Sequence, residues 1–289
     1  MSEVSFRLQS RDRQILKAVN DCQVLQISHI STMFFGSIKP AYGRVKKLVD
    51  AGYLEVHYLS AVTSAPASSE RIFTISRQGA MVLADTFGYS REEIHYASRQ
   101  VKSAEKVKSI LDLNRFRAYL YRASHDHPRV ELVRWVNEAK FRAQPDQVYI
   151  KNANGADSKK PIYPDGFFQM QVAVRDKVLV GDFFVESDSG LEGYAQFQTQ
   201  MEIYQAYILS GLFEERFQSQ SLRILIITNG ETRLKKLMEK TAQVGGRDRY
   251  WFTTFDRFES RPPEAILSTP IWSKINQGEL QTLIPSLEL

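Results

Sequence analysis

Apolar residues in the first 90 positions recur at the three- and four-residue spacing of short amphipathic helices. In the third of these helices, Val45, Leu48 and Val49 form an apolar stripe, while Lys46 and Lys47 lie off it. Two short strand-like stretches, separated by a small polar loop, follow this helix. The pattern predicts helices at 11–20, 28–35, 40–51 and 77–87, with strands at 53–59 and 70–75. Ser28 is the expected cap of the second helix, and Gly52 ends the third.

The pattern changes after residue 105, where a longer helix leads into alternating strands and helices. Residues 222–228 (LRILIIT) form a continuous apolar run, which is typical of a strand covered on both faces. The hydrophilic stretch 151–160 predicts a turn or mobile tip. We expect helices at 105–124, 191–210 and 231–243, with strands at 129–138, 163–174, 177–188, 222–228 and 250–255. The second half is therefore expected to be an α/β domain around a mixed sheet, and the whole chain to be α+β.

Three helices, a hairpin and a further helix are the layout of a winged helix-turn-helix. We therefore expect residues 1–90 to form a DNA-binding domain, 91–104 a linker and 105–289 the α/β domain. The third helix would enter the major groove of duplex DNA and present its cations there. The loop at 60–71 would be the wing. The expected DNA contacts are Arg44, Lys46, Lys47 and Arg71. The alternative is a unit of the same shape that contacts only proteins.

The distribution of charge favours the DNA-binding interpretation. The 289 residues carry a net charge of +5. Residues 1–150 hold 22 Lys and Arg against 15 Asp and Glu, whereas residues 151–289 hold 16 against 18. A basic half suits a polyanionic partner. The chain has one cysteine, no apolar run long enough for a membrane span and no secretory signal, so we expect a cytoplasmic protein with no membrane partner.

Three carboxylates near the ends of two expected strands could carry chemistry. Asp165 follows Pro164 at the start of one strand, and Glu186 and Asp188 share a face near the end of the next. If the strands form a hairpin, Asp165 and Glu186 approach each other across the pair. Close carboxylates repel unless a cation or proton lies between them, and oxygen ligands suit Mg²⁺ or Mn²⁺. A structural turn and a solvated strand end are the competing interpretations.

These residues also carry a family resemblance. The segments YPDGFF at 163–168 and FFVESDSG at 183–190 resemble the PD-(D/E)XK nuclease core of restriction-endonuclease-type enzymes, and the expected element order agrees. More of the chain resembles the replication-relaxation family of plasmids and other mobile elements. That resemblance includes VKKLVDAGYL, LNRFRAYLYRAS, VELVRWVNEAKF, YQAY and the late YWFTTFDRF. It implies a role in replication, relaxation or transfer of such an element. Double-stranded DNA is then the expected partner, with replication or relaxase proteins and a second copy of the chain as further candidates.

The sequence departs from the nuclease pattern at the position two residues after Glu186. A lysine is expected there, but the chain has Asp188, and the following helix offers only the neutral Gln200. A neutral side chain can orient water but cannot stabilise the charge of a phosphoryl transition state. We therefore expect an inactive or regulatory core. The alternative is a metal-dependent DNA endonuclease in which Asp165 and Glu186 bind the metal, Asp188 assists and Gln200 orients water. A transcription regulator or assembly adaptor is a third hypothesis.

Overall fold

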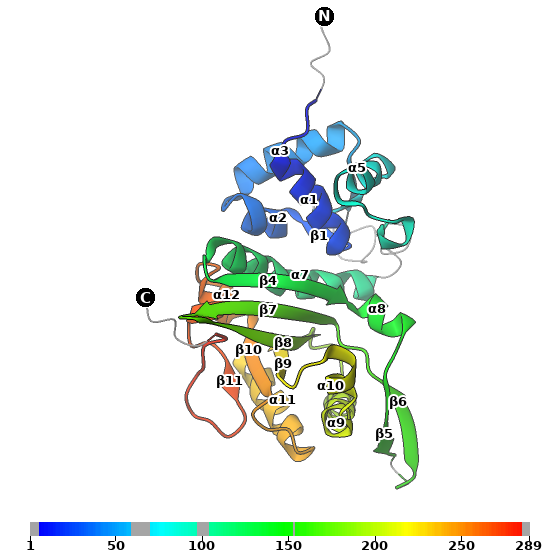
Figure 1. Ribbon diagram of the computed structural model, residues 1–289, viewed down its shortest axis with the longest axis vertical. Helices are drawn as coiled ribbons and strands as arrows, with labels where there is room; N and C mark the ends of the chain where they lie inside the picture. The colour runs from blue at the N-terminus through cyan, green and yellow to red at the C-terminus, as the bar shows by residue number, and fades with distance from the viewer. Residues whose placement is uncertain (1–5, 59–69, 97–103, 153, 285–289) are drawn as a thin grey trace, which may run out of the picture. The chain divides into compact units, whose positions relative to one another are not determined.

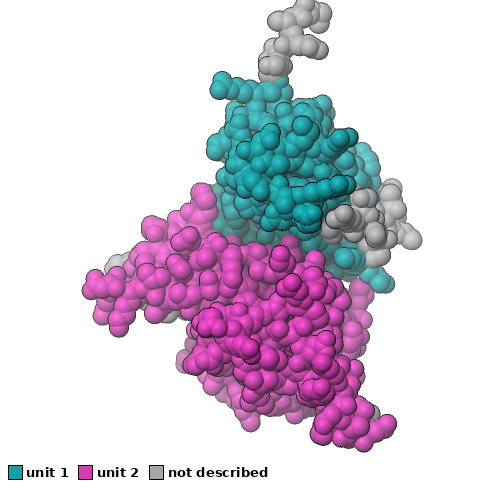
Figure 2. All heavy atoms as spheres, turned by 45° about the vertical axis from the view of Figure 1, so that its right-hand side comes forward, with its two compact units in different colours: residues 1–122 teal, residues 123–289 magenta. Residues whose placement is uncertain are grey.

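The computed structural model describes residues 6–58, 70–96, 104–152 and 154–284. The chain forms two compact units, residues 1–122 and 123–289, which Figure 2 shows in different colours. Both units combine helices with strands, and the second contains a mixed sheet, so the expected α+β class is confirmed. No helix in the described part of the chain is long and apolar enough to cross a membrane.

The first unit combines its helices with a small three-stranded sheet, and Figure 1 labels α1, α2, α3, α5 and β1 among its elements. Its strands run in the order β1-β3-β2 with antiparallel pairing throughout. Its elements are α1 (Ser10–Asp21), β1 (Leu25–Gln26), α2 (Ile27–Phe34), α3 (Ile38–Asp50), β2 (Leu54–Tyr58), β3 (Arg71–Ile75), α5 (Arg77–Phe87), η1 (Arg91–Glu93) and the part of α7 (Ala104–Asp126) up to Arg122. The expected helices and strands of this region are all present. The expected wing at 60–71 lies outside the described residues, apart from Glu70 and Arg71.

The core of this unit is built from one apolar stripe of each helix. Ile15 of α1, Val45 and Leu48 of α3, and Phe73 of β3 are all buried in one cluster. Cys22 follows α1 in this core, where its side chain is 3% exposed and burial raises its pKa to about 11. The core therefore holds the stripe of α3 that the sequence predicts and turns the opposite side of α3 outward.

Two boundaries of this unit differ from the sequence-based expectation. The N-cap of helix α2 is Gln26 and not Ser28, and the His29 ring accepts from the Gln26 N–H at 3.2 Å. Residues 91–96 are anchored, since Asn20 bonds both the Glu93 carbonyl and the His95 N–H. They belong to the first unit rather than to a linker.

Helix α7 also belongs to the first unit for most of its length. The Asn114 amide donates to the carbonyls of Cys22 and Val24, at 2.9 and 2.7 Å, and Arg117 donates to the Asp21 carbonyl at 2.8 Å. These bonds satisfy carbonyls in the turn after α1, where Gln23 adopts a positive φ of 68°. The division after Arg122 therefore differs from the expected start of the second domain at residue 105.

The second unit is a six-stranded mixed sheet in the order β11-β10-β9-β8-β7-β4. Strands β4, β7 and β8 form an antiparallel meander, and β8, β9 and β10 run parallel. The bounds of the unit's elements are β4 (Val130–Asn137), α8 (Glu138–Ala143), β5 (Gln147–Lys151), β6 (Asp157–Pro161), β7 (Gly166–Val174), β8 (Lys177–Asp188), α9 (Tyr194–Ser210), α10 (Leu212–Phe217), β9 (Leu222–Thr228), α11 (Glu231–Gln243), β10 (Tyr250–Thr254), α12 (Phe255–Glu259), α13 (Ala265–Ser268) and β11 (Ser273–Lys274).

Helices α9 and α11 cover one face of this sheet (Figure 1). Met201 of α9 and Leu237 of α11 are completely buried against Phe184, Ile224 and the other apolar residues of that face. The continuous apolar run of β9 is buried, as its composition predicts. The sequence predicts a turn or mobile tip at 151–160, but β5 and β6 form an antiparallel hairpin that includes most of this stretch. Polar and apolar residues alternate only weakly along these two strands, because most of their residues are polar. Hydrophobic periodicity therefore does not reveal the hairpin.

Candidate nucleic-acid interface and carboxylate cluster

Helix α3 presents a solvent face that is rich in cations. Lys39, Lys46 and Lys47 are all exposed on this helix. Lys46 pairs with Asp50 one turn later at 2.6 Å, and both side chains remain more than half exposed. Gly43 lies between these lysines, and a β-carbon built on it would have no atom within 4 Å. The helix therefore offers a basic surface with open space above its centre.

Arg44, on the same helix, points elsewhere. Its guanidinium forms a two-pronged ion pair with Asp12 of α1, in which Nε donates to Oδ1 at 2.6 Å and the second nitrogen donates to Oδ2. The Asp12 side chain is completely buried and also accepts from the Gln9 N–H at 2.6 Å. The guanidinium also lies over the Phe6 ring. Arg44 thus ties α3 to α1, and the structure separates it from the exposed lysines.

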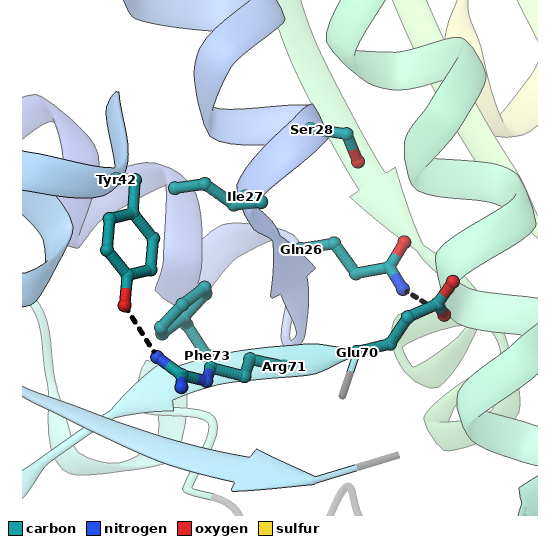
Figure 3. Close-up of a pocket in the computed structure, with 7 residues that line it drawn as sticks. All are labelled: Gln26, Ile27, Ser28, Tyr42, Glu70, Arg71 and Phe73. Carbon is teal, nitrogen blue, oxygen red and sulfur yellow. Dashed lines mark hydrogen bonds between the residues drawn. The ribbon is translucent and has the colours of Figure 1, made fainter. Parts of the chain in front are cut away.

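Arg71 lies at the start of β3, beside Tyr42 of α3. Its guanidinium donates to the Tyr42 hydroxyl at 2.9 Å and is 5.8 Å from the ring centres of both Tyr42 and Tyr58. The two tyrosines are 41% and 48% exposed. Arg71 also borders a pocket between α2, α3 and β3, whose lining residues are drawn in Figure 3. The structure therefore joins Arg71 to α3 through Tyr42, a partner that the sequence does not indicate.

In the second unit, the strand register brings Asp165 and Glu186 together. Gly166 of β7 is opposite Val185 of β8, so Asp165, just before β7, reaches the end of β8. Its carboxylate Oδ2 accepts from the Ser187 N–H at 2.8 Å. Burial raises the pKa of Asp165 to about 7, and the Ser187 hydrogen bond opposes that rise. The approach of these two carboxylates across the hairpin is as the sequence predicts.

Glu186 is held from α9 by two donors. Gln200 Nε2 donates to Oε2 at 2.7 Å, and the Tyr204 hydroxyl donates to Oε1. Glu186 is 7% exposed, so the interpretation of a solvated strand end does not apply to it. Burial, and then the charge of Asp165, raise the pKa of Glu186 well above its usual value. Sequence reasoning found Gln200 but not Tyr204, although the four-residue spacing places both on one side of a helix.

Asp188 is neutralised by an arginine. Arg233 of α11 donates to both carboxylate oxygens, at 2.5 and 2.6 Å, and the Thr228 hydroxyl donates to Oδ2 at 2.5 Å. Arg233 also donates to the Glu192 carbonyl at 2.8 Å and lies over the Tyr194 ring. Sequence analysis missed Arg233. Because β8 and β9 are parallel, a side chain in the first turn of the helix after β9 lies beside the end of β8.

The three carboxylates therefore have different partners. Asp165 and Glu186 form an acidic pair that accepts hydrogen bonds from the uncharged Ser187 N–H, Gln200 and Tyr204, whereas Asp188 binds Arg233. Among the residues that the structure describes, no group of three or more His, Cys, Asp and Glu side chains is arranged to hold a metal ion.

Comparison with known proteins adds the family. The family model described as replication-relaxation matches residues 16–219, which is more than half of the chain. The chain belongs to the replication-relaxation family. This confirms the family that the sequence motifs indicate. No curated protein and no solved structure gives a match. The part that matches the replication-relaxation model contains α3, the three carboxylates and Gln200, but it ends before β9 and Arg233.

Proposed function

We propose that this replication-relaxation protein binds double-stranded DNA through the exposed face of α3 and acts in replication, relaxation or transfer of a plasmid or other mobile element. The observation that carries the proposal is the open basic surface around Gly43. The order of α1, β1, α2, α3, β2 and β3 supports it, since this is the order of a winged helix-turn-helix with α3 as its recognition helix.

Gly43 supplies the physical reason to expect a close partner. Glycine inside a helix costs about 1 kcal/mol relative to alanine. The packing of the protein itself does not require a glycine at this position, because a side chain on residue 43 would extend into open space. A partner that approaches the helix closely would use that space, and the major groove of DNA admits a helix of this kind. Exposed Lys39, Lys46 and Lys47 on the same helix would then face phosphates or base edges.

For the second unit we propose a nuclease-like core that does not cleave. The antiparallel meander followed by a parallel crossover through α9 supports a PD-(D/E)XK-like arrangement. The position of the expected lysine is occupied by Asp188, and the nearby cation Arg233 is held by that aspartate. A guanidinium bound on two sides to a buried carboxylate is poorly placed to stabilise a developing charge on phosphate.

An active metal-dependent endonuclease is the second candidate, and one observation favours it. Asp165 and Glu186 lie together, and burial first, with the charge of Asp165 next in the case of Glu186, raises the pKa values of both carboxyl groups. A site of one or two carboxylates completed by water and substrate phosphate suits Mg²⁺ or Mn²⁺. Asp165 and Glu186 would hold the cation, which would supply an activated water for phosphodiester hydrolysis. Gln200 and Tyr204 would keep Glu186 oriented.

Two experiments test the proposal. The first measures affinity for duplex DNA as a function of salt for the wild type and the Lys46→Ala/Lys47→Ala variant. We expect weaker binding and a salt slope shallower by about 1.8, since each lost phosphate contact removes about 0.9. The matched control is Lys235→Ala/Lys236→Ala, which removes two adjacent exposed lysines from α11. Equal binding by both variants would overturn the assignment of α3.

The second experiment incubates supercoiled plasmid with the protein and Mn²⁺. We expect retarded but uncut plasmid for the wild type, Asp165→Asn and Glu186→Gln alike. Nicking by the wild type that both substitutions abolish would instead establish the endonuclease. Binding confined to a promoter fragment, with no cleavage, would favour a transcription regulator.

A further inference from the structure

The pocket beside α3 has the volume of a small-molecule site. It measures about 430 Å³. Ligand pockets in proteins commonly measure about 300–1,000 Å³, so one planar heterocycle can enter a pocket of this size. It lies between the start of α2, Tyr42 of α3 and the first residues of β3. Figure 3 shows the residues that line it: Gln26, Ile27, Ser28, Tyr42, Glu70, Arg71 and Phe73.

Two planar groups line this pocket, the Tyr42 ring and the Arg71 guanidinium. Tyr42 is exposed, and its hydroxyl is held by Arg71, which fixes the ring beside the guanidinium. Phe73 is buried and Ile27 half-buried, so the wall opposite the solvent is apolar. Aromatic rings and arginine planes are the surfaces on which unstacked nucleobases are held. Tyr58, also exposed and close to Arg71, extends the aromatic surface around the guanidinium.

The charge of the lining favours a neutral ligand over a phosphate. Arg71 contributes one positive charge and Glu70 one negative charge. Gln26 Nε2 donates to the Glu70 carboxylate at 3.1 Å, so the polar edge of the pocket offers both amide and carboxylate groups. A carboxylate accepts from the amino and imino groups of bases and repels phosphate. An unpaired base matches an apolar wall with such an edge, whereas a backbone phosphate does not.

We propose that this pocket binds one unpaired nucleobase of locally opened DNA, while the α3 face holds the adjoining duplex. The inference rests on the proposed binding of DNA by α3. Extruding a base from a duplex costs a few kcal/mol, and stacking it on an aromatic side chain returns about 1–3 kcal/mol. The pocket therefore favours DNA in which a base is already unpaired and binds an intact duplex through α3 alone.

The test compares two labelled duplexes of the same length and flanking sequence, one fully paired and one with a single unpaired guanine. Their affinities are measured by fluorescence anisotropy at one salt concentration. We expect the wild type to prefer the bulged duplex at least about five-fold, the lower end of what one stacked base provides. Tyr42→Ala should abolish that preference, so that this variant binds the two duplexes equally well. Tyr42→Phe, which retains the ring, should keep most of the preference.

The controls separate this inference from the proposed function. Lys46→Ala/Lys47→Ala should weaken both duplexes by the same factor and leave the preference unchanged. Tyr42 is a surface residue, so the thermal midpoints of its variants should match the wild type, which checks folding. Equal affinity for the two duplexes, or equal weakening of both by Tyr42→Ala, would overturn the pocket while leaving duplex binding intact. A wild type that binds neither duplex would overturn both proposals.

Discussion

In each unit an arginine from one helix forms a two-pronged ion pair with a buried aspartate from another element. In the first unit Arg44 binds Asp12, and in the second Arg233 binds Asp188. The surroundings differ. Arg44 lies on a helix that also carries three exposed lysines. Its ion pair therefore removes one cation from a surface that remains basic. Arg233 is bound by Asp188, and Asp165 and Glu186 accept their hydrogen bonds from uncharged groups. A charge counted in the sequence is therefore not always a charge that a partner can use.

The sharpest way to break this comparison is to remove Arg44. Arg44→Ala leaves the Asp12 carboxylate buried without its ion-pair partner, so we expect the free energy of unfolding to fall by about 3–5 kcal/mol. Urea unfolding monitored by circular dichroism measures it. Lys47→Ala, on the same helix but exposed, should change stability by no more than about 0.5 kcal/mol. Similar losses in the two variants would mean that Arg44 is a surface cation after all.

Arg233→Ala makes the corresponding change in the second unit. The Asp188 side chain is 5% exposed but keeps the Thr228 hydroxyl, so we expect a smaller loss of about 2–3 kcal/mol. Adding Asp188→Asn to Arg233→Ala should recover part of it, because no buried charge then remains. The exposed Lys236→Ala serves as the control in the same helix. A double variant less stable than Arg233→Ala would contradict this account.

The acidic pair should reveal itself through pH. The pKa of Asp165 is about 7 in the folded protein, against about 3.9 in an unfolded chain. Folding therefore favours the protonated carboxyl. This stabilisation is complete below pH 4 and disappears as pH rises toward 7, which costs about 2 kcal/mol for a side chain that solvent partly reaches. Unfolding free energies from pH 4 to 8 measure it for the wild type and Asp165→Asn. The variant should lose less stability over this range, and parallel curves would contradict the prediction.

Gly43→Ala has the smallest expected effects, which are higher stability and weaker binding of DNA. Gly43→Ala should raise the free energy of unfolding by about 0.5–1 kcal/mol, because alanine favours the helix and its methyl group meets no atom of the protein. The same methyl group should weaken binding of duplex DNA if a groove approaches α3 closely. Thermal unfolding and anisotropy measure the two effects. Gly278→Ala, also in open space but outside the helices, is the control for binding. A variant that is more stable and binds equally well would show that α3 has no close partner.

The elements of both units follow well from periodicity where a buried face is regular. The apolar stripe of α3 and the continuous run of β9 are two examples, and β9 and α11 have the bounds that the sequence predicts. The β5–β6 hairpin is missed because its residues are largely polar and gain little from burial. Ser28 is the better cap by residue type, yet Gln26 is the N-cap of α2, where the His29 ring accepts from the Gln26 N–H.

The candidate sites divide in the same way. The meeting of Asp165 and Glu186 follows from alternation and a tight turn, because hairpin register is a local property. The partners of Arg44 and Asp188 do not follow, since each ion pair joins elements distant in sequence. Arg233 is 45 residues from Asp188, and only the parallel pairing of β8 with β9 brings α11 to that carboxylate. Tertiary pairing of this kind leaves no periodic trace in the sequence.

The burial of Cys22 has a practical consequence. It is the chain's one cysteine, and its enclosed thiol remains protonated at neutral pH. The thiolate is the form that attacks thiol-reactive dyes, so the native protein should be almost inert to maleimide. A cysteine introduced at exposed Ser28, on the rim of the pocket, would then be the one reactive position without any need to replace Cys22. The fold thus allows a single fluorophore to be attached beside α3, where it would test the proposed DNA binding in real time.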